Sequence, residues 1–212
     1  MTSITLAGGG ELFDRCHKII KNYQATHPGI VLNLTRKGET LDYYKQDILF
    51  SAGYDRLVGS DLLNHCLCIN LHLSPLPKYG GFNPVYWAII RGEREWAVTI
   101  HKMAEEFDTG DIIYQRFFEI MPEDTARTLY DRAVIIAGEM FSDNLENIVL
   151  GKFRLTKQDI TQRSFFRKKD ADFGRAIVLS TPELRARIFP PFPNPIVVIG
   201  GKRYTLSEEK KG

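Results

Sequence analysis

The chain has 212 residues, of which 43% are hydrophobic and 25% are charged, and its formal net charge is +2. These values are ordinary for globular proteins and exclude disordered and fibrous classes. A charge so close to balance predicts no strong attraction to nucleic acid, and apolar runs far shorter than the ~18 residues of a membrane-spanning helix predict no membrane insertion.

Two further features bear on the cellular compartment. Residues 1–10 lack a basic stretch followed by a long apolar one, which argues against secretion. The three cysteines, Cys16, Cys66 and Cys68, are odd in number and have no framework spacing, as is typical of a reducing compartment. Cys66 and Cys68 are also too close in sequence for a usual zinc pair. We therefore expect a cytoplasmic protein without a metal site.

The first part of the chain alternates between predicted strands and helices. Short runs rich in apolar and β-branched residues predict strands at residues 4–7, 30–34, 47–53 and 67–72. Apolar residues at helical spacing from Leu12 to Tyr23 predict a helix after the first strand, and a short helix is expected at 60–63 with Ser60 as its N-cap. This alternation predicts a Rossmann-like, mostly parallel sheet flanked by helices.

The second part adds four elements and then changes in character. A helix at 84–91 ended by Gly92, strands at 97–101 and 111–118, and a long helix from Thr125 to about Leu150 are predicted. Charged residues dominate after Lys152, and residues 196–206 predict a β-hairpin that turns at Gly200 and Gly201. We therefore predict a catalytic domain at residues 1–155 and a C-terminal extension at residues 156–212.

Three glycines, Gly8 to Gly10, follow the first predicted strand. Backbone N–H groups at a helix N-terminus can hold a phosphate, so Gly9 and Gly10 are candidate contacts for a substrate. The spacing is not G-x-G-x-x-G, however, and Glu11 would repel a phosphate. A plain tight turn is the better interpretation.

Asn70 and His72 are two residues apart on a predicted strand, so their side chains point to the same face. At the carboxyl end of a parallel strand they would lie in the crevice where such sheets bind ligands. An isolated pair of this kind is more often a buried histidine beside a capping asparagine. Here the rigid segment 74–81, which contains Pro75, Pro77 and two glycines, follows at once and favours a functional site.

Asp108 supplies the third candidate group, in the acidic loop 105–110 between two predicted strands. A lone aspartate in a loop more often forms a turn, but this one could orient His72 and favour its imidazolium form. An asparagine that donates to an oxyanion, a histidine that moves a proton and an aspartate that positions it are suited to direct acyl transfer to an amine.

With these residues the chain resembles the folate-dependent formyltransferases, which include glycinamide-ribonucleotide, methionyl-tRNA and sugar-nucleotide N-formyltransferases. Three blocks in order carry the resemblance: residues 69–81, 98–101 and 108–113. The resemblance implies the formyltransferase fold, Asn70, His72 and Asp108 as the catalytic trio, and N10-formyltetrahydrofolate as the one-carbon donor.

The same resemblance implies a slot for the pterin ring of the donor between residues 51–58 and 103–107. The residues that it assigns to the donor are Tyr54, Arg56, Val58, Met103, Ala104, Glu105, Glu106 and Phe107. A flat ring needs an apolar slot with a few backbone donors and acceptors, which these segments can supply. His101 falls outside the trio, and we expect it to have a structural role.

For the acceptor, residues 81–88 and 185–193 resemble sugar-nucleotide enzymes, and we do not expect the long C-terminal domain of methionyl-tRNA formyltransferases. The resemblance implies a nucleotide-linked amino sugar as acceptor, used for cell-surface polysaccharide such as O-antigen, and a homodimer formed through C-terminal strands. The acceptor contacts that it implies, beside Gly9 and Gly10, are Ser74, Pro75, Leu76, Lys78, Tyr79, Gly81 and Asn83.

The chain departs from the family in two places. The family often has arginine at the position of Gly80, so Lys78 or the basic cluster at 163–169 would hold phosphate instead. The segment 35–47 is short, as in formylation domains of peptide synthetases. This keeps a carrier-bound aminoacyl group or a ribonucleotide amine as alternative acceptors, and a non-catalytic nucleotide-binding module as an alternative outside the enzyme class.

Overall fold

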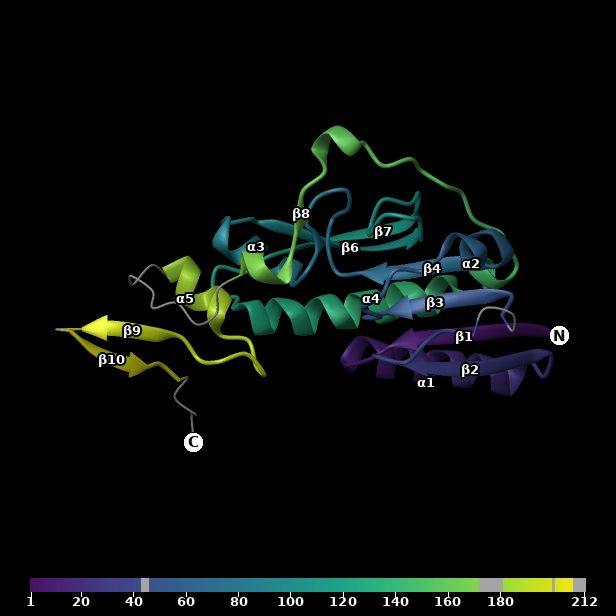
Figure 1. Cartoon of the computed structure of the whole chain (residues 1–212), viewed down its shortest axis with the longest axis horizontal. Coiled ribbons are helices and arrows are strands. Elements are labelled where there is room, and N and C mark those ends of the chain that lie inside the picture. Colours follow the sequence, from purple (N-terminus) through teal and green to yellow (C-terminus); the bar gives the residue numbers. More distant parts are fainter. Residues whose placement is uncertain (43–45, 172–180, 200, 208–212) are drawn as a thin grey trace.

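The computed structural model describes residues 1–42, 46–171, 181–199 and 201–207. Its centre is a six-stranded sheet with strand order β2-β1-β3-β4-β6-β7 (Figure 1). The strands are β1 (Thr2–Gly8), β2 (Ile30–Arg36), β3 (Ile48–Ala52), β4 (Leu67–His72), β6 (Glu95–Lys102) and β7 (Ile112–Glu119). Each lies within a few residues of a predicted strand, because these runs carry enough apolar and β-branched residues to be buried in a sheet.

The prediction of a mostly parallel sheet is confirmed. Strands β1 to β4 pair in parallel with one another. Strand β6 runs against the others, because it pairs antiparallel with both β4 and β7. The chain leaves β1 for β2 on one side and returns to β3 on the other, so the sheet has a topological switch beside β1, where α/β sheets bind ligands.

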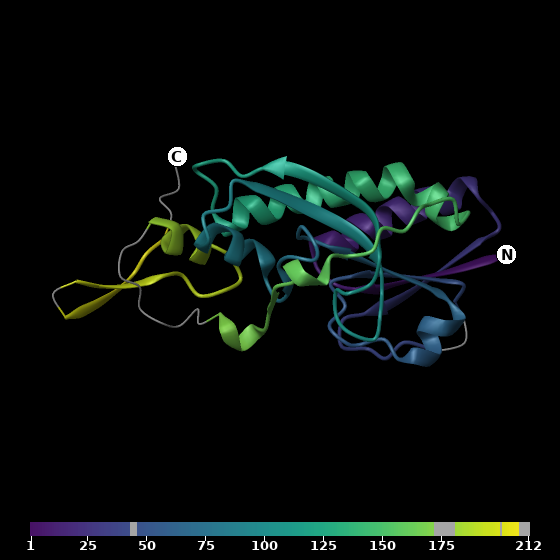
Figure 2. The same ribbon diagram turned by 90° about the horizontal axis from the view of Figure 1, so that it is seen from above.

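Helices cover both faces of the sheet, as Figure 2 shows. On one face α1 (Glu11–Thr26) packs against α4 (Ala126–Val149), and both contribute to the largest apolar core. On the other face the short helix α2 (Ser60–His65) buries Leu62 against Leu49 and Cys68. A further helix, α3 (Pro84–Ile90), follows β5 (Gly80–Gly81) and adds a smaller core around Trp96.

The two helix starts that we predicted have different outcomes. The long helix starts at Thr125, as predicted, and Thr125 is its N-cap: its hydroxyl accepts a hydrogen bond from the Thr128 N–H, and the Thr128 hydroxyl accepts one from the Thr125 N–H. The prediction that Ser60 caps α2 is wrong. Gly59 is the N-cap, with extended backbone, and Ser60 is already the first helical residue. None of the helices in the described ranges is long and apolar enough to cross a membrane.

Beyond α4 the chain returns across the sheet to strand β5. It crosses above the sheet through η1 (Ile160–Gln162), and β8 (Phe165–Phe166) then pairs in parallel with β5 (Figure 1). After η2 (Lys168–Asp170), helix α5 (Thr181–Arg187) packs on α3. The predicted hairpin is present as β9 (Ile196–Ile199) and β10 (Lys202–Thr205), while Gly200, at its predicted turn, is outside the described residues. The division near residue 155 stays a prediction.

Candidate active site

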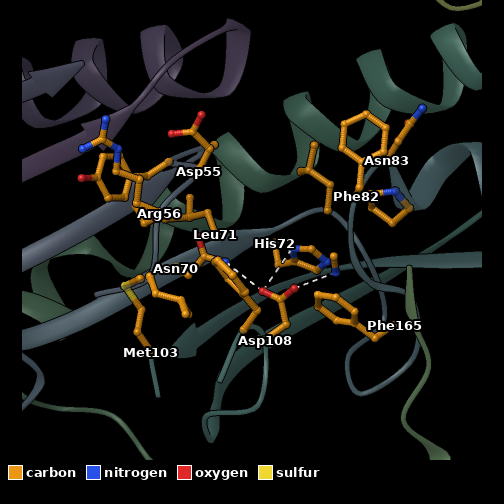
Figure 3. A pocket seen from close by; sticks show the side chains of 18 of the residues that line it. Asp55, Arg56, Asn70, Leu71, His72, Phe82, Asn83, Met103, Asp108 and Phe165 are labelled. Atoms are coloured by element: carbon orange, nitrogen blue, oxygen red, sulfur yellow. Dashed lines mark hydrogen bonds and ion pairs between the residues drawn. The ribbon is translucent and has the colours of Figure 1, made fainter. Parts of the chain in front are cut away.

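A cavity of about 740 Å³ opens where β1, β3 and β4 end. Gly9 follows β1, residues 53–58 follow β3, and His72 ends β4, and all of them line it. Asn70 and Asp108 lie in the same wall (Figure 3). The cavity therefore occupies the crevice that the sequence predicted for a ligand.

The three predicted catalytic side chains converge in this wall. Asp108 Oδ1 lies 3.6 Å from His72 Nδ1 and 3.5 Å from Asn70 Nδ2 (Figure 3). His72 Nε2 lies 3.2 Å from the Tyr79 carbonyl oxygen, to which it can donate. Both ring nitrogens of His72 thus face acceptors, to which each can donate a hydrogen bond when it carries a proton. Contacts of this length in a site without substrate often tighten when the substrate binds.

The loop that carries Asp108 is held from several sides. Asp108 has a left-handed backbone (φ 59°), and its Oδ2 accepts a 2.7 Å hydrogen bond from the Gly81 N–H. Gln158 donates to the carbonyl oxygens of Asp108 and Gly110. A Cβ at Gly110 would lie 1.9 Å from the Lys102 carbonyl oxygen, so only glycine lets this loop pack so closely on β6. The position of the carboxylate is therefore fixed by backbone contacts.

The two predicted donor-binding segments lie on the cavity walls. Tyr54, Arg56 and Val58 line one wall, and Met103, Ala104, Glu106 and Phe107 line the other. Glu105 lies instead at a neighbouring hollow of about 620 Å³, which also contains Arg163. The backbone N–H of Met103 donates to the Cys68 carbonyl oxygen, which ties the second wall to β4. The assignment of these residues to the donor stays a prediction.

The predicted acceptor contacts divide into two groups. Gly9, Gly81 and Asn83 line the cavity. The other predicted contacts are not among the described residues that line the cavity: Gly10, Ser74, Pro75, Leu76, Lys78 and Tyr79. The polar groups of this turn are used internally: the buried Ser74 hydroxyl donates to the Lys78 carbonyl oxygen, and the Tyr79 hydroxyl donates to Glu93. Burial raises the pKa of Tyr79 to about 12.

The structure gives a reason for glycine at position 80. A Cβ there would lie 3.1 Å from the ring of Phe165 and 3.4 Å from Asp108 Oδ2. Phe165 reaches this place because β8 pairs with β5, with Phe165 beside Gly80. A side chain at position 80, where the family often has arginine, would therefore lie against the Phe165 ring and the Asp108 carboxylate.

The sequence interpretation gave two parts of the site a lesser role than the structure does. Residues 165–168 line the cavity, whereas the sequence named the basic cluster at 163–169 only as an alternative to Lys78 for holding phosphate. His101 also lies in the wall, with Nε2 3.1 Å from Asn70 Nδ2 and 3.7 Å from Asp108 Oδ1. Burial lowers the pKa of His101 to about 4 despite the nearby Asp108. Knowing how β4 and β6 pair would have identified His101 as part of the site, since β6 places His101 directly beside Asn70.

Comparison with known proteins agrees with this geometry. Residues 31–145 match the family described as formyl transferase. The methionyl-tRNA formyltransferase of Anaeromyxobacter sp. (strain K) is 36% identical over 172 residues, which cover 78% of this chain and 55% of that protein. The enzyme of the same name from Desulfotalea psychrophila is 31% identical over 173 residues, covering 79% and 54%. The chain spans about half the length of the curated relatives that it matches.

Solved structures with this fold include several sugar formyltransferases. WlaRD, a sugar 3N-formyl transferase determined with dTDP and 5-N-formyl-THF, has a TM-score of 0.78 and 28% identity, covering 96% of this chain and 84% of WlaRD. PseJ from Anoxybacillus kamchatkensis, in complex with a UDP-linked formamido sugar and tetrahydrofolate, has a TM-score of 0.66 and 27% identity, covering 79% and 87%. Because the match to the family model spans more than half of the sequence, the chain belongs to the formyl transferase family.

Proposed function

We propose that this chain transfers a formyl group from N10-formyltetrahydrofolate to the primary amine of a nucleotide-linked amino sugar. The observation that carries the proposal is the meeting of Asn70, His72 and Asp108 in the wall of one deep cavity, with contacts of 3.5 and 3.6 Å between them. An amide donor, an imidazole and a carboxylate supply what acyl transfer to an amine requires.

The cavity suits a flat, mostly apolar donor. Leu57 and Phe107, on opposite walls, leave 54% and 39% of their surfaces exposed, which a bound aromatic ring would cover. The backbone of residues 53–58 and 103–107 can supply the donors and acceptors that recognise the polar edge of the ring. When bound, the folate supplies the activated formyl group.

The residues of the trio then have separate tasks. The Asn70 amide donates to the formyl oxygen as negative charge develops there. The neutral acceptor amine attacks the formyl carbon, and the bond from that carbon to the folate nitrogen breaks. His72 carries a proton to the departing nitrogen, and Asp108 orients the ring and stabilises its charged form. The proton that the amine loses restores the protonation of this pair.

The acceptor's phosphates fit Arg167 and Lys168 better than Lys78. Both line the cavity, whereas Lys78 is not among the described residues of its walls. Arg56, the other cation in the wall, donates 2.6 Å to the Gly38 carbonyl oxygen. Arg167 and Lys168 lie at the exposed rim, where flexible cations can close on a diphosphate.

The same chemistry with another acceptor is the second candidate. The curated relatives at 36% and 31% identity are methionyl-tRNA formyltransferases, which favours an aminoacyl amine. A carrier-bound aminoacyl group and a ribonucleotide amine belong to the same group of alternatives. The extent of the match to WlaRD, 96% of this chain and 84% of WlaRD, supports the sugar instead.

One assay separates these acceptors. The protein is mixed with N10-formyltetrahydrofolate and each candidate amine, and the release of free tetrahydrofolate is followed by absorbance. The panel contains dTDP- and UDP-linked amino sugars, glycinamide ribonucleotide, an aminoacyl carrier and methionyl-tRNA. We expect turnover with an amino-sugar nucleotide. Turnover with methionyl-tRNA alone would move the assignment to the second candidate, and binding of nucleotides without turnover would favour a non-catalytic module.

The homodimer stays part of this proposal. The β9–β10 hairpin projects from one end of the molecule, and its Val198 and Tyr204 are about half exposed (Figure 1). An exposed strand pair with apolar side chains on β9 is suited to pairing with a second copy. Light scattering is expected to give twice the mass of one chain, and a monomer mass at micromolar concentration would contradict it.

A further inference from the structure

His101 faces Asn70 across the antiparallel pair of β4 and β6. Its Nε2 lies 3.1 Å from Asn70 Nδ2, and its side chain is only 1% exposed. The contact is shorter than the 3.5 Å between Asn70 Nδ2 and Asp108 Oδ1. Asn70 therefore has its closest side-chain partner outside the trio.

The second ring nitrogen determines which atom of His101 carries the proton. Nδ1 lies 2.7 Å from the Lys102 carbonyl oxygen, and because a carbonyl oxygen only accepts, Nδ1 must donate. In the neutral ring Nε2 then has a free lone pair and can only accept. Burial keeps the ring neutral near pH 7, since it lowers the pKa of His101 to about 4.

This assignment determines the orientation of the Asn70 amide. An acceptor at His101 Nε2 requires the NH₂ group of Asn70 at this place, because the amide oxygen would meet a lone pair there. The flipped amide would also turn its oxygen toward the Asp108 carboxylate, which repels it. One N–H of Asn70 is thus bound to His101. The other points toward Asp108 at 3.5 Å, a long contact that an oxygen of a substrate bound in the cavity can replace.

We infer that His101 is a positioning residue, which holds the Asn70 amide so that its second N–H is directed into the cavity, toward the reacting carbonyl. This role rests on the proposed formyl transfer. It differs from the purely structural role that the sequence suggested, because it acts through one named hydrogen bond. A substitution of His101 should therefore change the rate of the chemical step more than the binding of the folate.

The first test compares two substitutions at this position. His101→Leu removes the acceptor, and we expect kcat to fall ~10- to 100-fold, less than the loss of an oxyanion donor itself, with KM for the folate within about twofold. His101→Gln offers an oxygen near the position of Nε2 and should recover most of the loss. In an Asn70→Ala background, His101→Leu should lower kcat by less than about twofold further. Equal losses in both backgrounds, or no loss in the unaltered background, would overturn the inference.

The second test does not depend on activity. Long-range ¹⁵N–¹H spectra should show His101 as the neutral Nδ1–H form at pH 7. The side-chain NH₂ signals of Asn70, identified by their absence in Asn70→Ala, should shift in His101→Leu and be restored in His101→Gln. An Nε2–H form, or unchanged Asn70 signals in His101→Leu, would overturn the inference. If the unaltered protein formylates no amine, the proposed function fails, and these spectra still decide whether His101 holds the amide.

Discussion

The turn at residues 74–79 leads into β5 and the segment at residues 165–168 begins with the strand that pairs with β5, but the two contribute to the site in different ways. The turn directly follows β4, yet its residues are not among the described residues that line the cavity. The segment 165–168 is remote in sequence and lines the cavity. The turn instead supplies the Tyr79 carbonyl oxygen that accepts from His72. Closeness in sequence to a catalytic residue thus indicates support as readily as it indicates contact with substrate.

The largest effect is expected where the turn and the trio meet. His72→Ala removes the group that moves the proton, and we expect kcat/KM for formyl transfer to fall about 10³-fold. The side chain is 11% exposed and lines the cavity, so its removal enlarges an existing cavity and leaves no sealed void in the core, and the variant should still fold. The exposed His65, at the end of α2, provides the control, and His65→Ala should retain full activity. Near-normal turnover of His72→Ala would contradict the proposed role.

The pairing of the two segments can be broken at Gly81. This residue has φ 87°, and a Cβ would lie 2.2 Å from the Phe166 carbonyl oxygen. Gly92 has φ 66° with nothing within 4 Å of its Cβ position, so Gly92→Ala carries only the cost of the left-handed backbone. We expect urea unfolding to show a loss of about 1 kcal/mol for Gly92→Ala and about 3 kcal/mol for Gly81→Ala. Equal losses of unfolding free energy in the two variants would mean that separating β5 from β8 does not destabilise the protein.

These two regions also show what the sequence could predict. Strands β1 to β4 could be predicted, and Asn70, His72 and Asp108 could be named as candidates, because their signals are local: apolar runs, the spacing of two residues on one strand, and one acidic loop. The pairing of β5 with β8 is not local, so the place of Phe165 beside Gly80 could not be read from either segment. His101 was placed outside the site because its contact with Asn70 depends on the alignment of β6 with β4. Ser60 failed as a cap because Gly59 can take the same extended backbone conformation.

A smaller effect should distinguish the cations of the two segments. Arg167→Gln and Lys168→Gln each remove one charged donor from the cavity rim, and we expect each to weaken nucleotide diphosphate binding about tenfold. Lys78→Gln is the matched change in the turn and should leave the affinity within about twofold. Calorimetry with dTDP, UDP and GDP measures all three variants. Loss of affinity only in Lys78→Gln would return the phosphate site to the turn.

The smallest effect concerns support by the turn alone. Ser74 is fully buried, and its hydroxyl donates 3.1 Å to the Lys78 carbonyl oxygen. Ser74→Ala should lower the free energy of unfolding by about 1 kcal/mol, because a part-buried hydrogen bond to the Lys78 carbonyl oxygen is lost. Ser60→Ala is the control, since the exposed Ser60 makes no capping bond, and should cost less than about 0.5 kcal/mol. Nucleotide affinity should stay unchanged in both. If Ser74→Ala weakened nucleotide binding without a loss of stability, the turn would contact the acceptor, and the contrast with residues 165–168 would no longer hold.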